Sequence, residues 1–199
     1  LPGDDLAWGI YQRCRGLLAD AGYRQYEVSA YARPGGRCRH NLNYWRFGDY
    51  LGIGAGAHGK LTPAGGGLPV RSLKHRHPRA YLEGAESGRF DLMRRTCEAK
   101  SLPLEFMMNA LRLMDGVELT RFTETTTLPL EVILPQLELC RERGLLEESP
   151  DRLQPTPQGF RFLNELLLLF AGADTEAKTA VSGATVAVAP YAATGGAVT

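Results

Sequence analysis

The densest group of residues capable of chemistry is the segment Arg37-Cys38-Arg39-His40-Asn41-Leu42-Asn43-Tyr44-Trp45-Arg46. It holds an imidazole, a thiol, three guanidinium groups and two aromatic rings. An imidazole can bind iron, guanidinium groups pair with carboxylates, and aromatic rings offer flat faces. The composition suits a flat, anionic, metal-bearing ligand. From these residues alone, however, a structural interpretation is favoured, in which a buried His-Asn network holds a loop and Tyr44 and Trp45 belong to the core.

Two other segments could contact a ligand. Residues 52–58 are rich in glycine, but no helix with a third spaced glycine follows and no acidic residue lies about 20 positions on, as a dinucleotide site requires. We interpret this segment as the end of a strand whose small residues let a ligand or another backbone approach closely. A second basic cluster, which we interpret as solvated surface, consists of His75, Arg76, His77 and Arg79.

Composition limits the class of protein. Of the 199 residues, 44% are hydrophobic and 23% are charged, which is ordinary for one large or two small globular domains. The longest near-apolar run, 166–173, is far shorter than the ~20 residues of a membrane span. The four cysteines have no spacing typical of disulfide frameworks or CxxC metal sites. Without a signal peptide and with Leu1 in first place, we expect a cytoplasmic chain that begins inside a longer protein.

The charge is divided unevenly along the chain. Residues 1–100 hold 16 Lys/Arg and 9 Asp/Glu, a balance of +7, whereas residues 101–199 hold 7 and 13, a balance of −6. This division indicates two units with different partners, the basic one suited to phosphate, carboxylate or nucleic acid. Solvated surface charge explains the division equally well.

The first half has the pattern of an α/β protein. An amphipathic helix over 4–22, a strand at 26–29, a break at 32–36 and a strand over 50–58 resemble the last units of a (β/α) barrel. We therefore assign residues 1–62 to a partial barrel. A hairpin of 59–62 with 68–73, turning at three consecutive glycines, and a helix over 78–87 predict a connecting unit at 63–97.

The second half, 98–172, is predicted to be a helical, winged-helix-like domain. We expect helices from Ser101, near 119–124, over 129–143 with Pro135 either kinking or delaying it, and from the cap Thr156 onward. Segments 145–146 and 152–154 would form the wing. The helix over 129–143 carries Glu131, Glu138 and Glu142, so we expect no nucleic-acid binding. The weakly charged tail, 173–199, is expected to be disordered.

Segments 26–32, 38–45 and 48–59 together resemble the HemW-type heme chaperones, relatives of oxygen-independent coproporphyrinogen III oxidase in the radical SAM superfamily. The resemblance covers about residues 4–172. Its most specific part is the HNxxYW motif at 40–45.

The resemblance implies an incomplete radical SAM barrel with a [4Fe-4S] cluster on CxxxCxxC, bound S-adenosylmethionine and a helical C-terminal domain. This chain has no CxxxCxxC, so we expect only the C-terminal portion, unable to perform radical chemistry by itself. The family's HNxxYW motif implies that His40 is the heme ligand, with Asn41, Tyr44 and Trp45 around it. Ala57 and His58 would lie near the S-adenosylmethionine pocket.

Three functions follow as hypotheses. In the first, the chain is part of a chaperone that binds heme and passes it to acceptor hemoproteins, membrane-associated ones included. In the second, the parent is an oxygen-independent coproporphyrinogen III oxidase that decarboxylates propionates by a radical route. In the third, residues 98–172 are a winged-helix module that binds a partner protein. The motif favours the chaperone, and the sequence leaves the acceptor and the oligomeric state open.

Overall fold

The computed structural model describes residues 3–171; the predicted tail at 173–199 lies outside this range. The helices are α1 (Asp4–Asp20), α2 (Arg39–Trp45), α3 (Pro78–Glu86), α4 (Leu102–Ala110), α5 (Thr120–Thr126), α6 (Leu134–Glu142), α7 (Pro157–Arg161) and α8 (Leu163–Leu168). The strands are β1 (Arg24–Glu27), β2 (Ala30–Ala32), β3 (His58–Leu61), β4 (Val70–Lys74), β5 (Asp91–Thr96), β6 (Val117–Glu118) and β7 (Arg152–Leu153).

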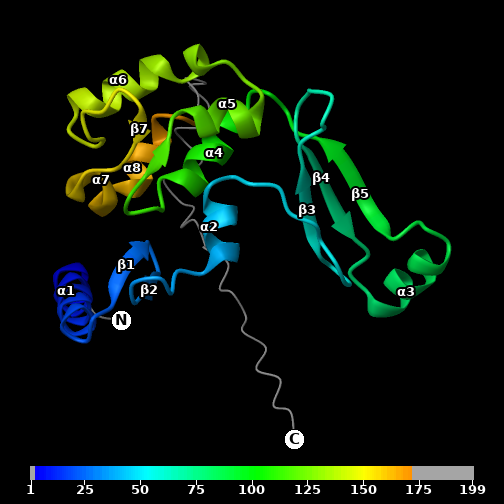
Figure 1. Cartoon of the computed structure of the whole chain (residues 1–199), viewed down its shortest axis with the longest axis horizontal. Coiled ribbons are helices and arrows are strands. Elements are labelled where there is room, and N and C mark those ends of the chain that lie inside the picture. The colour runs from blue at the N-terminus through cyan, green and yellow to red at the C-terminus, as the bar shows by residue number, and fades with distance from the viewer. Residues whose placement is uncertain (1–2, 172–199) are drawn as a thin grey trace, which may run out of the picture.

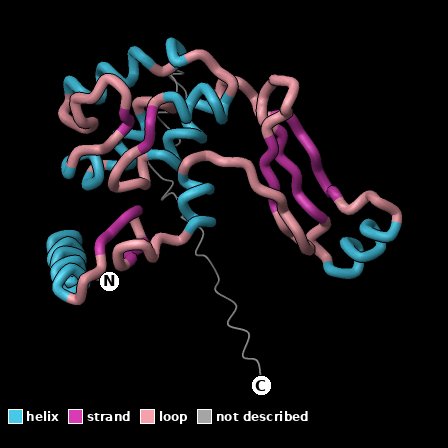
Figure 2. The backbone as a smooth tube through the Cα atoms, in the orientation of Figure 1, coloured by secondary structure: helices cyan, strands magenta, loops and turns pink. Residues whose placement is uncertain are grey.

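These elements form three parts, with the short helix α2 between two of them (Figure 1). Helices α4–α8 and the β6–β7 pair make a helical unit, α1 and the β1–β2 hairpin lie below it, and the sheet β3-β4-β5 with α3 lies to one side. Figure 2 shows how little of the described chain is strand compared with helix and loop. Within residues 3–171 every strand pair is antiparallel and no barrel is closed.

The helical unit holds the main core, and its local signals agree with the sequence. Pro135 follows the first residue of α6, and a 3-10 turn at Leu130–Val132 precedes the helix, so of the two predicted effects, a kink or a delay, the structure shows the delay. Thr156 caps α7 by accepting a hydrogen bond from the Gly159 N–H at 3.0 Å. The fully buried side chains that α4 contributes to this core are Leu102, Phe106, Met107 and Ala110, with Leu111 following the helix.

The strand predicted at 50–58 is wrong. Its first residue, Tyr50, forms an isolated bridge with Lys60 and its last, His58, begins β3, but 51–57 is a loop in which Gly54 and Gly56 have φ of 102° and 72°. A strand cannot continue through these positive φ values. Leu51 and Ile53 are consequently 72% and 83% exposed.

The predicted hairpin between 59–62 and 68–73 is confirmed as β3 and β4, paired antiparallel from His58↔Leu73 to Leu61↔Val70. Strand β5, which the sequence did not indicate, adds to β4 and extends the sheet. The sheet therefore crosses residue 62, where the barrel unit was expected to end.

Helix α1 is confirmed over nearly its predicted length, but its apolar face has no cover in this part of the chain. Leu6, Ile10 and Leu17 are 61%, 50% and 55% exposed. This exposure agrees with a partial barrel, which leaves apolar faces uncovered. Among the described helices, none has both the length and the apolar character needed to cross a lipid bilayer.

Candidate functional site

The predicted chemical segment forms helix α2 and a tight turn after it, not the loop of the structural interpretation. The turn begins at Phe47, whose φ of 55° ends the helix. The Gly48 N–H then donates to the Asn43 carbonyl at 2.8 Å, and the Asn43 side chain donates to the Asp49 carbonyl at 2.9 Å. A Cβ at Gly48 would collide with the Asn43 side chain, so the turn requires glycine.

One face of α2 is held against the protein. Asn41 Nδ2 donates to the Tyr26 hydroxyl at 3.5 Å, and Trp45 packs against the main core. The Arg112 guanidinium lies over the Trp45 ring, 4.3 Å from its centroid. Since Asn41 and Trp45 are one turn apart, these contacts fix both the position and the rotation of the helix.

A buried ion pair supports this face. The Arg112 guanidinium donates to the Glu27 carboxylate at 3.0 Å, and Glu27 is only 2% exposed. Backbone hydrogen bonds join the same segments, from the Val28 N–H to the Arg112 carbonyl and from the Met114 N–H to the Tyr26 carbonyl. The β1 hairpin, the end of α4 and α2 therefore form one assembly.

A second face of α2, about 100° around the helix from the first, is more open. His40 is exposed and has no hydrogen-bond partner among residues 3–171, so the predicted buried His-Asn network is absent there. Tyr44, one turn further, is 37% exposed, and its ring centroid lies 5.3 Å from that of Tyr50. This face offers an accessible imidazole beside an aromatic ring.

The third face of α2 lines a concave groove of about 500 Å³, which we call the arginine groove. Its far wall is formed by β6, β7 and the start of α5. The charged side chains that line it are Arg39, Arg46, Arg121 and Arg152, with Glu118 as the acidic one. Arg39, Asn43 and Arg46 are three and four positions apart, so helical spacing alone could have placed them on one face. No local sequence signal indicated that Arg121 or Arg152 would line the same groove.

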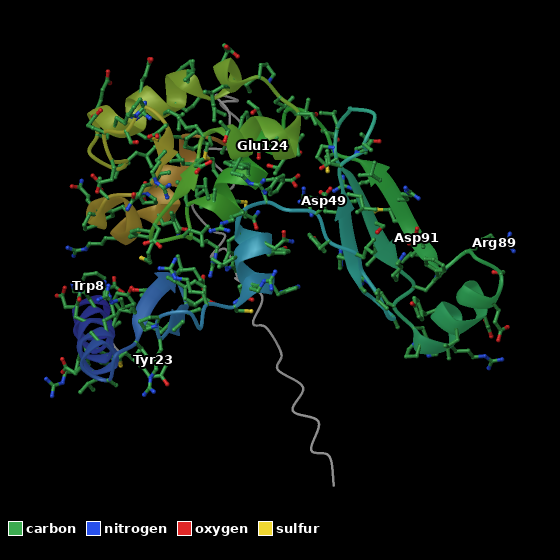
Figure 3. All side chains as sticks on the ribbon, in the orientation of Figure 1. Trp8, Tyr23, Asp49, Arg89, Asp91 and Glu124 are labelled. Carbon is green, nitrogen blue, oxygen red and sulfur yellow. The ribbon has the colours of Figure 1, made fainter. Side chains whose placement is uncertain are left out.

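A buried lysine connects the turn after α2 to the sheet. Lys60 is 1% exposed, its Nζ lies 3.1 Å from Asp49 Oδ1, and it lies 4.3 Å from the centroid of the Phe47 ring. Figure 3 shows Asp49 between α2 and the sheet. Burial lowers the pKa of Lys60, while Asp49 offsets part of that shift. Burial alone would raise the pKa of Asp49, but hydrogen bonds from Thr62 and Lys60 hold it below its ordinary value.

The structure does not bring the remaining predicted residues to α2. Ala57 accepts a hydrogen bond from the Lys74 N–H at 2.9 Å, and the exposed His58 begins β3, apart from α2 (Figure 1). His75 lies beside the same loop, where its carbonyl accepts from the Gly56 N–H at 2.8 Å. These residues belong to the sheet part of the molecule.

Metal-binding groups are sparse in the part of the chain that is described. No three His, Cys, Asp or Glu side chains there come together as a metal site. Cys14 and Cys38 are exposed, Cys97 and Cys140 are buried, and burial raises the pKa of Cys140 to about 11.

A second, larger hollow lies between α1 and the segment leading into α7, with a volume of about 1000 Å³. Its aromatic lining comes from Trp8, Tyr11, Phe160 and Phe162, and Arg161 lies over the Trp8 ring at 5.1 Å. None of the residues singled out from the sequence for binding lies there.

Comparisons with known proteins agree with the resemblance in sequence. Residues 98–162 match the family described as the HemN C-terminal domain. The chain is 48% identical over 170 residues to "Heme chaperone HemW" of Escherichia coli, covering 85% of this chain and 44% of that protein. It is 44% identical to the protein of the same name from Haemophilus influenzae, and that match covers 85% of this chain and 43% of the relative.

Two further matches place the chain more broadly. It is 56% identical over 73 residues to a mouse "Radical S-adenosyl methionine domain-containing protein 1, mitochondrial", covering 37% of this chain and 16% of that protein. Its fold matches the E. coli coproporphyrinogen III oxidase HemN, described as a radical SAM enzyme, with a TM-score of 0.57 and 15% identity over 86% of this chain and 42% of that one. The chain thus spans less than half the length of the bacterial relatives that it matches.

Proposed function

We propose that this chain is the C-terminal portion of a HemW-type, coproporphyrinogen III oxidase-like protein, and that it binds heme on α2 with His40 as the ligand of the iron; its similarity to the bacterial heme chaperones and to the HemN C-terminal domain supports this. Heme is cargo in this proposal, to be passed on to acceptor hemoproteins, membrane-associated ones included. The relatives' name, heme chaperone, supports this direction over the oxidase.

The observation that carries the proposal is the exposed His40 imidazole on a helix whose other side is fixed. No described side chain forms a hydrogen bond with it, so its nitrogens are available to iron without breaking a contact. Tyr44 lies on the same open face and provides an aromatic surface beside the ligand. Asn41 and Trp45 act from the buried side and keep the imidazole at a fixed place.

The open face also suits transfer. A single imidazole is enough for heme, because the macrocycle itself supplies the other nitrogen ligands of the iron. A site without a closed wall leaves the opposite side of the heme accessible to an acceptor protein. A resident cofactor would instead be expected in an enclosed, largely apolar pocket.

The same proposal includes the rest of the parent protein. We infer that a [4Fe-4S] cluster and S-adenosylmethionine are held mainly by residues outside this chain, with Ala57 and His58 at the edge of the latter's pocket. The loop before β3 supports this assignment, because its glycines at positive φ leave backbone accessible to a ligand.

Heme titration followed by Soret absorbance tests the role of His40. We expect a saturable, shifted band in the chain and a much weaker one in His40→Ala. His77→Ala is the matched control, because it removes another exposed imidazole, in the sheet part of the molecule. Equal bands in the chain and in His40→Ala would show that His40 is not the ligand.

A further inference from the structure

The arginine groove beside α2 is a strongly basic hollow. His40, the proposed ligand of the heme iron, does not line it. Four arginines and one glutamate line its volume of about 500 Å³. Arg39 begins α2 and Arg46 directly follows its last residue; both are exposed, and neither guanidinium has an ion-pair partner within residues 3–171. Positive charge is in excess over the single Glu118 carboxylate of this lining, and a concavity with an excess of one charge favours binding of the opposite ion.

The opposite wall of the groove contributes two more guanidinium groups, those of Arg121 and Arg152. Arg121 donates to Glu124 at 2.9 Å and to the Arg46 carbonyl at 3.3 Å, but its buried Nε has no partner in the described chain. Arg152 donates to the Asp115 carbonyl. These contacts hold both guanidinium groups in place, so they are ordered before a ligand arrives.

The groove adjoins the face that carries His40. At 3.6 residues per turn, Arg39 and His40 are about 100° apart around α2, and Asn43 lies between them in projection. The groove and the open face are therefore neighbouring sides of one short helix. A ligand held at His40 can extend an edge over Arg39 into the groove.

We propose that the arginine groove binds the propionate carboxylates of the heme whose iron His40 holds, which deepens the proposed function and rests on it. Guanidinium groups recognise carboxylates through paired, charge-assisted hydrogen bonds. The iron is then held from one face of α2 and the carboxylates from the next, and two weak contacts on one helix give an oriented ligand.

The test compares hemin with hemin dimethyl ester, which keeps the iron and the ring but has no free carboxylates. Arg39→Gln and Arg46→Gln should each weaken hemin binding by about tenfold or more, the value of a charge-assisted hydrogen bond, and leave binding of the ester unchanged. Arg79→Gln on α3 is the control, because this exposed arginine pairs only with Glu83 in the sheet part.

The outcomes separate the two proposals. No shifted Soret band with either porphyrin would refute heme binding itself. Hemin binding that is equal in the chain and in both arginine variants would refute the groove as the carboxylate site. If the variants weaken hemin and the ester alike, these arginines only support α2, and the groove inference is wrong as well.

Discussion

The ion pair of Lys60 and Asp49 should respond very differently to loss of its two partners. Lys60 is 1% exposed, whereas the Asp49 side chain is 38% exposed. At their separation of 3.1 Å, an effective dielectric constant of 20 gives an attraction of about 5 kcal/mol. Asp49→Asn leaves a buried ammonium without its counter-ion, and water around the aspartate reduces the loss, so we expect unfolding free energy to fall by about 3 kcal/mol.

Lys60→Met should cost less than about 1 kcal/mol, because it removes the buried charge and keeps the stem that packs on Phe47. Asp49 then keeps the Thr62 N–H at 2.8 Å and the Thr62 hydroxyl at 3.0 Å. Urea unfolding followed by circular dichroism at neutral pH measures both variants. Equal losses, or a loss below 1 kcal/mol in Asp49→Asn, would refute this account of the pair.

The pH dependence of the unfolding free energy provides a second test of the Lys60–Asp49 pair. Hydrogen bonds hold the pKa of Asp49 below its ordinary value in the folded protein, so the stability that it contributes is complete above pH ~3.9. That contribution is lost as the pH falls through the lower folded value, where the carboxylate becomes protonated. The stability difference between the chain and Asp49→Asn should therefore shrink in acid, and a constant difference down to pH 2 would contradict the linkage.

Two further predictions concern the elements that support α2 and the helical unit. Thr156→Ala should lower the unfolding free energy by about 1 kcal/mol, because the Gly159 N–H loses its cap, and Thr156→Ser should restore most of it; no change in urea midpoint would remove the role of the cap. Glu27→Gln should weaken heme binding while leaving an imidazole at His40, because the buried Arg112 loses its charged partner and with it the fixed position over Trp45. Near-ultraviolet circular dichroism of Trp45 and heme affinity should change together, and an altered affinity with an unchanged tryptophan signal would disprove this coupling.

Much of the helical unit could be predicted from the sequence because its signals are local. Pro135 is tolerated in the first turn of a helix but not in its interior, Thr156 satisfies an N–H three residues away, and Gly144 adopts a φ of 65° after the end of α6. The HNxxYW motif likewise directed attention to His40 before any fold was known. Each of these inferences depends on neighbours within about one helical turn.

Tertiary structure decided which side of α2 is fixed, which is open and which is basic, and residues close in sequence cannot decide this. The same seven residues of α2 have a fixed side, an open side and a basic side, and the assignment depends on Tyr26, Arg112 and Arg152, which come from other elements. Glu27 and Arg112 are 85 positions apart in the chain, so no local pattern could pair them.

The loop at 50–57 shows the same limit. Its glycines permit either a strand or a turn, and the structure uses them at positive φ, where the Gly56 N–H donates to the carbonyl of His75. The sequence, through the family resemblance that it carries, thus predicted which residues could bind a flat anionic ligand. Contacts between distant segments determined which of their side chains stay open to it, because burial and charge pairing depend on the whole fold.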